Sequence, residues 1–185
     1  TVFVRPTSNL EGLQPLGVDY VVGDALNMED VEAAFAPGTF DAAISSLGGR
    51  RAEPRPDYIG NRNITDAAKA TGVRRVIQVS ANGVADAPTE PPPPDAFMPN
   101  VFYEKKRGED YLIASGLDWT IIRPVGLRDG PATGTGQLLP PDSGGGVIMR
   151  ADVGRLVVES LDDPITIGRI YNANDPELPA EPVAR

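Results

Sequence analysis

Cysteine and histidine are both absent from the 185-residue chain. The absence of cysteine excludes disulfides, thiolate nucleophiles and cysteine metal ligands. The absence of histidine also excludes Ser-His-Asp triads, Cys-His pairs and the usual zinc sites. We therefore predict no metal site, and any proton transfer must use Tyr, Lys, Ser, Asp, Glu or the substrate itself.

Basic residues and long apolar runs are also scarce. The chain has 17 Lys and Arg against 26 Asp and Glu, and its net charge of −9 repels nucleic acid and anionic membranes. Its longest apolar runs, such as residues 119–122, are far shorter than the roughly 20 residues that span a bilayer. The first residues do not have the pattern of a secretion signal. We expect a cytoplasmic monomer or homodimer that acts on a small-molecule substrate and binds neither nucleic acid nor membrane.

The residues that are present predict a single α/β domain. Hydrophobic residues make up 41% of the chain, which is enough for one core. Short β-branched runs alternate with segments of helical period, a pattern typical of βαβ units. The predicted fold is a doubly wound, mostly parallel sheet in a three-layer α/β/α arrangement. Its strands are expected at residues 2–5, 18–22, 40–45, 76–80, 118–123 and 167–171.

Capping residues predict where the helices begin and end. Asn27, followed by acidic residues, predicts one helix start, and Asp152 predicts another. Gly72 and Gly116 predict C-caps, because glycine readily adopts the left-handed conformation there. The helices are expected after Asn27, at residues 59–70 and 103–115, and from Asp152 onward.

Two long segments show neither a helix nor a strand pattern. Residues 81–100 include four successive prolines at 91–94, and residues 126–146 are rich in Gly and Pro. Both follow the carboxyl ends of predicted strands, where ligands bind in open α/β sheets. We therefore expect two long loops over a binding site.

Six segments, taken in order, resemble one protein family. They are VFVRP at 2–6, VVGDALN at 21–27, DAAISSLGG at 41–49, NITDAAKATGVRRVIQVS at 63–80, KRGEDYLIASGLDWTIIRP at 106–124 and RADVGRLVVESLDDP at 150–164. The ordered set spans nearly the whole chain and resembles the NmrA-like, NAD(P)H-binding branch of the atypical short-chain dehydrogenases/reductases. That group includes flavin and biliverdin reductases. The resemblance implies a Rossmann-type fold with NADP(H) as the cofactor.

The resemblance also implies a missing start. Family members begin with a strand and a glycine-rich turn that seats the cofactor pyrophosphate at a helix N-terminus. Here the first predicted strand corresponds to the family's second strand, and no later glycine-rich stretch lies between a strand and a helix. Either residues 1–185 are a single NAD(P)-binding domain that is incomplete at its N-terminus, which we favour, or the chain has lost its main phosphate site. We predict a further strand between residues 2–5 and 40–45, supplied by residues outside this sequence or by another chain.

The resemblance places the cofactor at the carboxyl ends of the strands. Arg5 stands where an arginine accommodates the 2′-phosphate of NADP, with Thr7 and Ser8 as further donors, although an ordinary surface arginine is the alternative. Asp24 and Ala25 resemble the adenine contact, and a strand-to-helix turn is their alternative interpretation. The other implied cofactor contacts are Ser45, Ser46, Leu47, Gly48, Gly49, Arg50, Lys106, Pro124 and Val125.

The family's catalytic Ser, Tyr and Lys are matched only in part. Lys106 stands where the family has its lysine, but Phe102 occupies the position four residues earlier and Tyr103 is displaced by one. A shift of one residue turns a helical side chain by about 100°. Ser80 is displaced by one residue as well, so a structural role is equally open for it. Lys106, Tyr103 and Ser80 are the predicted catalytic residues.

These observations favour an NADPH-dependent oxidoreductase that mainly orients the nicotinamide and a small carbonyl, quinone or flavin-like substrate. Two alternatives remain open. One is a non-catalytic NADP(H)-binding regulatory protein. The other is an epimerase or isomerase of the same superfamily. The fold does not distinguish them, because function depends on the site.

Overall fold

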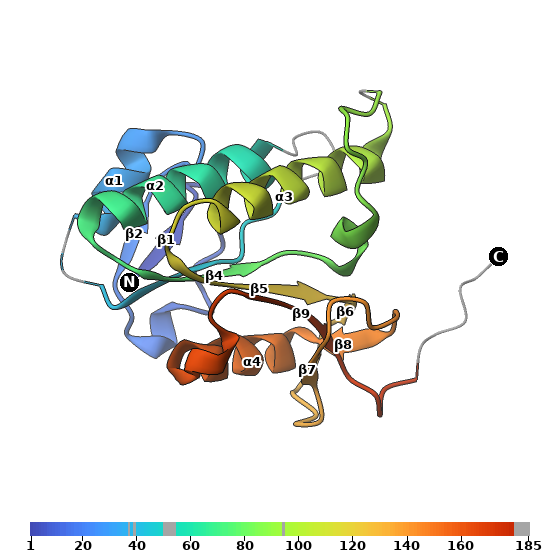
Figure 1. Cartoon of the computed structure of the whole chain (residues 1–185). Helices are drawn as coiled ribbons and strands as arrows, with labels where there is room; N and C mark the ends of the chain where they lie inside the picture. Colours follow the sequence, from blue (N-terminus) through green and yellow to red (C-terminus); the bar gives the residue numbers. More distant parts are fainter. Residues whose placement is uncertain (37, 39, 50–54, 94, 180–185) are drawn as a thin grey trace.

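The computed structural model describes residues 1–36, 38, 40–49, 55–93 and 95–179. Its main sheet has five strands in the order β3-β4-β5-β9-β7, of which the first four are parallel and β7 runs antiparallel to β9. Helices α1, α2 and α3 cover one face of the sheet and α4 covers the other (Figure 1). The predicted three-layer, mostly parallel fold is confirmed. The five strands are β3 (Ala42–Ser45), β4 (Arg75–Val79), β5 (Asp118–Pro124), β7 (Gln137–Leu139) and β9 (Arg169–Asn174).

The helices begin and end close to the predicted residues, with three corrections. The Asn27 side chain accepts the N–H of Glu29 at 2.9 Å, and Gly72 has a left-handed φ of 80°, so both predicted caps are confirmed. Helix α3 begins six residues earlier than predicted, and its C-cap is Ala114, not the predicted Gly116. Asp152 is not the cap of α4, which starts two residues before it. The helices are α1 (Met28–Phe35), α2 (Asn61–Thr71), α3 (Phe97–Ile113) and α4 (Arg150–Asp162).

The prediction of a structureless loop over residues 126–146 was wrong. β6 (Gly126–Arg128) pairs in parallel with β8 (Val147–Met149), and β7 lies at the edge of the main sheet. Each of these strands is three residues long and is stabilised by a partner distant in sequence, so a local pattern does not reveal it. Single helical turns connect other elements: η1 (Gln14–Leu16), η2 (Pro56–Gly60), η3 (Asn82–Asp86) and η4 (Pro164–Thr166).

The core lies on both faces of the central strands. Ile77 of β4 and Ile122 of β5 pack against α4, while Val76 and Ile121 face the layer formed by α2 and α3. The side chains of Ile77, Ile121 and Ile122 are fully buried. These strands are hydrophobic on both faces because helices cover both.

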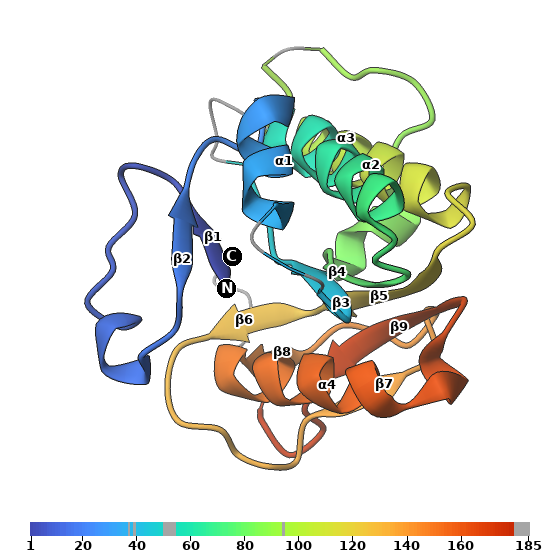
Figure 2. The same ribbon diagram turned by 90° about the vertical axis from the view of Figure 1, so that its left-hand side faces the viewer.

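β1 (Val2–Val4) and β2 (Tyr20–Val22) form a separate parallel pair beside the main sheet. Figure 2 shows this pair standing apart from β3. A cavity of about 130 Å³ lies between them, and Phe3, Phe35 and Ile44 are among the residues that line it. β1 and β3 do not pair with each other. Direct pairing between them would have contradicted the expected intervening strand. That strand stays a prediction.

Candidate functional site

A second cavity, of about 170 Å³, lies where β1, β2 and β3 end. Carboxyl ends of neighbouring parallel strands meet at one edge of a sheet, and ligands of such folds bind there. Arg5 and Asp24 are the two charged residues of its lining. The lining comprises Phe3, Val4, Arg5, Gly23, Asp24, Ala25, Ser46, Leu47, Gly48 and Pro56. Six of the predicted cofactor contacts therefore surround one cavity.

Arg5 follows β1 and begins a tight turn. The N–H of Ser8 donates to the carbonyl of Arg5 at 2.9 Å, and the N–H of Arg5 donates to the hydroxyl of Ser8 at 3.1 Å. This turn leaves the Arg5 residue exposed at the cavity. Thr7, also exposed, and Ser8 do not line the cavity, and the Ser8 hydroxyl already accepts a hydrogen bond from the turn.

Asp24 and Ala25 form the turn between β2 and α1. The Asp24 carboxylate accepts the N–H of Leu26 at 2.9 Å, while the N–H of Asp24 donates to Asp30 at 2.8 Å. The carbonyl of Ala25 accepts a hydrogen bond from Nδ2 of Asn63 at 2.9 Å. These bonds make the turn rigid and tie it to α1 and α2, so Asp24 has a structural role as well as its place at the cavity.

The loop after β3 approaches α2 closely. Ser45 is buried, and its hydroxyl donates to Oδ1 of Asn61 at 2.6 Å, which directs it into the protein. A Cβ on Gly60 would lie 2.8 Å from the end of the Leu47 side chain, so a larger residue there would require Leu47 to move. Ser46 and Gly48 are exposed at the cavity. The predicted contact Arg50 lies outside the described residues.

Two neighbouring lysines of α3 point in different directions. Lys106, the predicted catalytic residue, forms a surface ion pair with Asp110, and its side chain is 40% exposed. Lys105 is only 13% exposed and lies 2.6 Å from the buried carboxylate of Asp57. Its Nζ is also 3.9 Å from the point where a Cβ on Gly48 would stand. The structure thus brings Lys105, and not Lys106, to the loop that lines the cavity.

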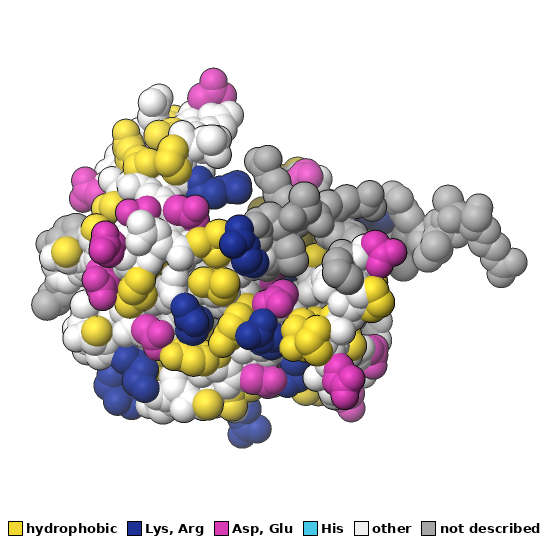
Figure 3. Space-filling model, turned by 90° about the horizontal axis from the view of Figure 1, so that it is seen from above, with side chains coloured by type: hydrophobic (Ala, Val, Ile, Leu, Met, Phe, Trp, Pro, Cys, Tyr) yellow, Lys and Arg dark blue, Asp and Glu magenta, His cyan; other side chains and the backbone are white. Residues whose placement is uncertain are grey.

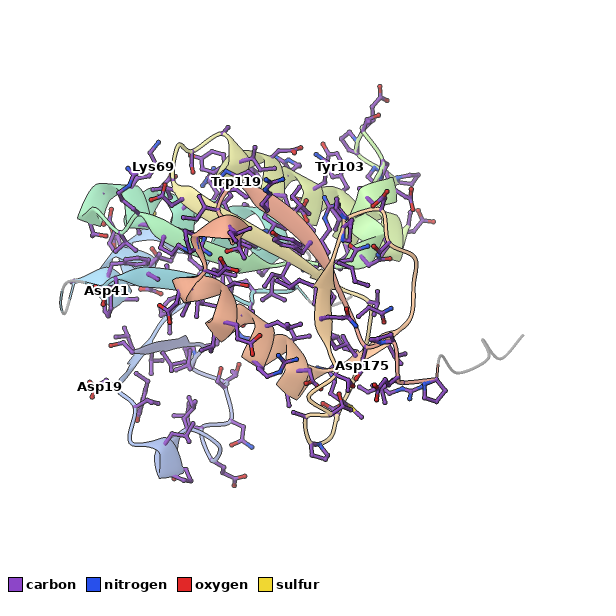
Figure 4. The ribbon with its side chains drawn as sticks, turned by 60° about the horizontal axis from the view of Figure 1, so that its bottom comes forward. Asp19, Asp41, Lys69, Tyr103, Trp119 and Asp175 are labelled. Atoms are coloured by element: carbon purple, nitrogen blue, oxygen red, sulfur yellow. The ribbon has the colours of Figure 1, made fainter. Side chains whose placement is uncertain are left out.

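The other predicted catalytic residues lie just after β4 and in the first half of α3. Ser80 follows β4 and is 8% exposed, and its Oγ has no hydrogen-bond partner among the described residues. Tyr103 is half-buried, and the guanidinium of Arg107 lies 5.6 Å from its ring. Figure 4 shows Tyr103 on α3, at the opposite side of the view from Lys69 and Asp41.

Pro124 and Val125, at the end of β5, are both buried. The N–H of Val125 donates to the carbonyl of Ala173 at 3.1 Å, and its side chain packs against α4 in the core. This position suits a packing role. Neither residue belongs to the lining of the cavity at the ends of β1–β3.

Sequence reasoning missed Asp57 and Lys105. A signal for Lys105 was available, because residues 101, 105, 108 and 112 share one helical face with spacings of four and three. Val101, Gly108 and Leu112 are all buried, so this is the face that α3 turns toward the protein. No comparable signal existed for Asp57, since its burial depends on η2 and α3, which meet only in the tertiary structure.

Positive and negative side chains are mixed on the side of the molecule formed by α1, α2 and α3. Figure 3 shows Lys and Arg interspersed with Asp and Glu there, and Arg107 pairs with Glu104 at 3.1 Å.

None of the helices in the described part of the chain is long and apolar enough to cross a bilayer. Within the same residues, no three His, Cys, Asp or Glu side chains are placed to hold a metal ion.

Comparison with known proteins gives consistent relatives. A family described as NAD(P)H-binding matches residues 1–164. YhfK of Bacillus subtilis, described as an uncharacterized sugar epimerase, is 32% identical over 182 residues, covering 95% of this chain and 82% of that protein. Sanguinarine reductase of Eschscholzia californica is 35% identical over 119 residues, covering 57% of this chain and 40% of that protein. The structure of ChuY, an anaerobillin reductase from Escherichia coli O157:H7, is 30% identical with a TM-score of 0.79 and covers 96% of this chain and 84% of that one.

Proposed function

Because the chain belongs to the family of NAD(P)H-binding proteins, we propose that it is an NADPH-dependent reductase. Its substrate is a small carbonyl, quinone or flavin-like molecule. When bound, the cofactor supplies the hydride. The chain's own residues bind the cofactor, orient it and keep water from the reacting atoms. Two relatives that are named as reductases, ChuY and sanguinarine reductase, support this assignment.

The observation that carries the proposal is the cavity at the ends of β1–β3. Arg5 stands at its rim and suits the 2′-phosphate, because a guanidinium pairs with phosphate through two charge-assisted hydrogen bonds. Asp24 and Ala25 suit the adenine end. The exposed backbone of Ser46 and Gly48 suits a diphosphate or ribose, since small residues allow close approach.

We assign the nicotinamide-ribose contact to Lys105 in place of Lys106. Lys105 lies beside Gly48, whereas Lys106 pairs with Asp110 on the surface. Tyr103, on the same helix, or solvent supplies the proton. The buried hydroxyl of Ser80 has no hydrogen-bond partner among the described residues, and in this proposal it positions a substrate oxygen.

A second candidate function is an epimerase that removes a hydride and returns it to the same substrate. It is favoured by the 32% identity to YhfK over 95% of this chain. Net oxidation of NADPH distinguishes the two, because an epimerase regenerates its cofactor in each cycle. NADPH binding without any turnover would instead indicate a regulatory protein.

The assignment of Arg5 is tested by titrating NADPH and NADH against the wild-type protein and Arg5→Ala. The variant loses a charge-assisted bond of about 1.5–3 kcal/mol, so NADPH affinity falls at least about tenfold while NADH affinity changes little. Arg74→Ala is the matched control, since Arg74 pairs with Asp118 at the opposite ends of the strands. Equal losses for both cofactors in Arg5→Ala would remove the assignment.

The reductase activity is tested by following NADPH oxidation with a panel of quinones, flavins and carbonyl compounds. Turnover with one of these classes supports the proposal and identifies the substrate class. Conversion of a sugar nucleotide without net NADPH oxidation would support the epimerase instead.

A further inference from the structure

Asp57 is a fully buried carboxylate that the proposed reaction does not use directly. It lies in η2, the turn that precedes α2. Its Oδ2 accepts the N–H of Gly49 at 2.8 Å, and its Oδ1 lies 2.6 Å from Nζ of Lys105. One side chain therefore joins the loop after β3, the start of α2 and the middle of α3.

The surrounding backbone is shaped to bring these three elements together. A Cβ on Gly108 would lie 2.5 Å from the Asp57 carbonyl, so α3 can approach η2 only because residue 108 is glycine. The same carbonyl accepts a hydrogen bond from Nδ2 of Asn61 at 2.8 Å. A buried charge is costly unless it is paired, and the Asp57 carboxylate is paired with Lys105 through Oδ1 and hydrogen-bonded to Gly49 through Oδ2.

We propose that Asp57 is a positioning residue that acts through Lys105. It holds the Lys105 ammonium beside Gly48, where the ammonium contacts the nicotinamide-ribose half of the cofactor. This inference rests on the proposed function. It also implies that the lysine and the glycine-containing loop are set in place together, because the same carboxylate binds both.

The competing interpretation is that Asp57 only stabilises the fold. Asp57→Asn separates the two roles. The amide has nearly the same size, and its oxygen can still accept the N–H of Gly49. It carries no negative charge, however, so it no longer holds the ammonium. The loop anchor is kept while the position of Lys105 is lost.

The experiment measures the binding of NADPH and of 2′,5′-ADP, which contains the adenosine half of the cofactor but no nicotinamide ribose. Asp57→Asn is expected to weaken NADPH by about tenfold, equivalent to one charge-assisted contact, and 2′,5′-ADP by less than about twofold. Lys105→Met is expected to give the same pattern. The matched control is Asp110→Asn, which removes the aspartate paired with the neighbouring Lys106 and leaves both affinities unchanged.

The double variant Asp57→Asn/Lys105→Met removes both charges, so it keeps the test available if the single aspartate variant does not fold. Its NADPH affinity equals that of Lys105→Met when Asp57 acts only through Lys105. A further loss in the double variant, or an equal loss of NADPH and 2′,5′-ADP in Asp57→Asn, overturns this inference alone. A full-length wild-type protein, with the expected N-terminal strand and glycine-rich turn in place, that binds neither ligand overturns the proposed function and this inference with it.

Discussion

The β1–β2 pair and the β4–β5–β9 strands are built from similar residues but differ in burial. Val2–Val4 is half-buried throughout, and Tyr20 and Val22 of β2 are 49% and 50% exposed. In β5, by contrast, five successive residues from Thr120 are buried. The difference arises because β4 and β5 have a strand on each side and helices on both faces, whereas β1 pairs only with β2 among the described residues.

This comparison shows that a β-branched run predicts a strand but not its environment. Val22 and Ile121 both follow the strand pattern, and only Ile121 lies in the core. The free energy that such a residue contributes depends on the apolar area that its neighbours cover. The following predictions test the comparison, from the largest expected effect to the smallest.

Ile121→Ala is expected to lower the free energy of unfolding by about 2–5 kcal/mol, because it leaves a cavity in the core. Val22→Ala, the matched change in the β1–β2 pair, is expected to cost no more than about 0.5 kcal/mol. Urea unfolding of both variants measures the difference. Similar losses would show that the two regions are equally packed in solution.

Acid is expected to destabilise the better packed region, because the buried carboxylate Asp152 lies there. Burial opposes its ionisation, but hydrogen bonds from Thr133 and the N–H of Gly134, together with the charge of Arg155, hold the pKa of Asp152 below its ordinary value of 3.8. The folded state therefore binds fewer protons than the unfolded state. The resulting stability is present above pH 3.8 and is lost as the pH falls below it.

Asp152→Asn is accordingly expected to lower stability at pH 6 by about 1–3 kcal/mol, since buried N–H donors lose part of their acceptor. It should also make the decline in stability below about pH 4 shallower than in the wild-type protein. Urea unfolding at several pH values measures both effects. An unchanged pH dependence in the variant would assign the acid sensitivity to other groups.

The smallest expected effects come from one glycine in each region. Gly154 lies in α4 with no atom within 4 Å of an added Cβ, so Gly154→Ala is expected to raise stability by about 0.5–1 kcal/mol. Gly17, between β1 and β2, has a φ of 61°, and Gly17→Ala is expected to lower stability by about 1 kcal/mol. Thermal unfolding measures both shifts. Shifts of the same sign would contradict the backbone argument.

One part of the candidate site could be predicted from the sequence, and another part could not. The residues that follow β1, β2 and β3 could be assigned from the sequence, because parallel strands bring their carboxyl ends to one edge. Arg5, Asp24 and Gly48 accordingly line one cavity. The choice between Lys105 and Lys106 depends on the rotation of α3, because neighbouring residues point about 100° apart around the helix axis, and the structure places Lys105 beside the loop after β3.

The sequence by itself determined the fold class, the main helices and strands, the caps at Asn27 and Gly72, and the residues at the strand ends. These depend on short-range periodicity and on local backbone preferences. The tertiary structure alone decided the pairing of β6 with β8, the burial of Asp152 and the meeting of Asp57 with Lys105. Each of these depends on segments distant in the chain, and the energy of a buried charge or a short strand is set by the partners that folding brings to it.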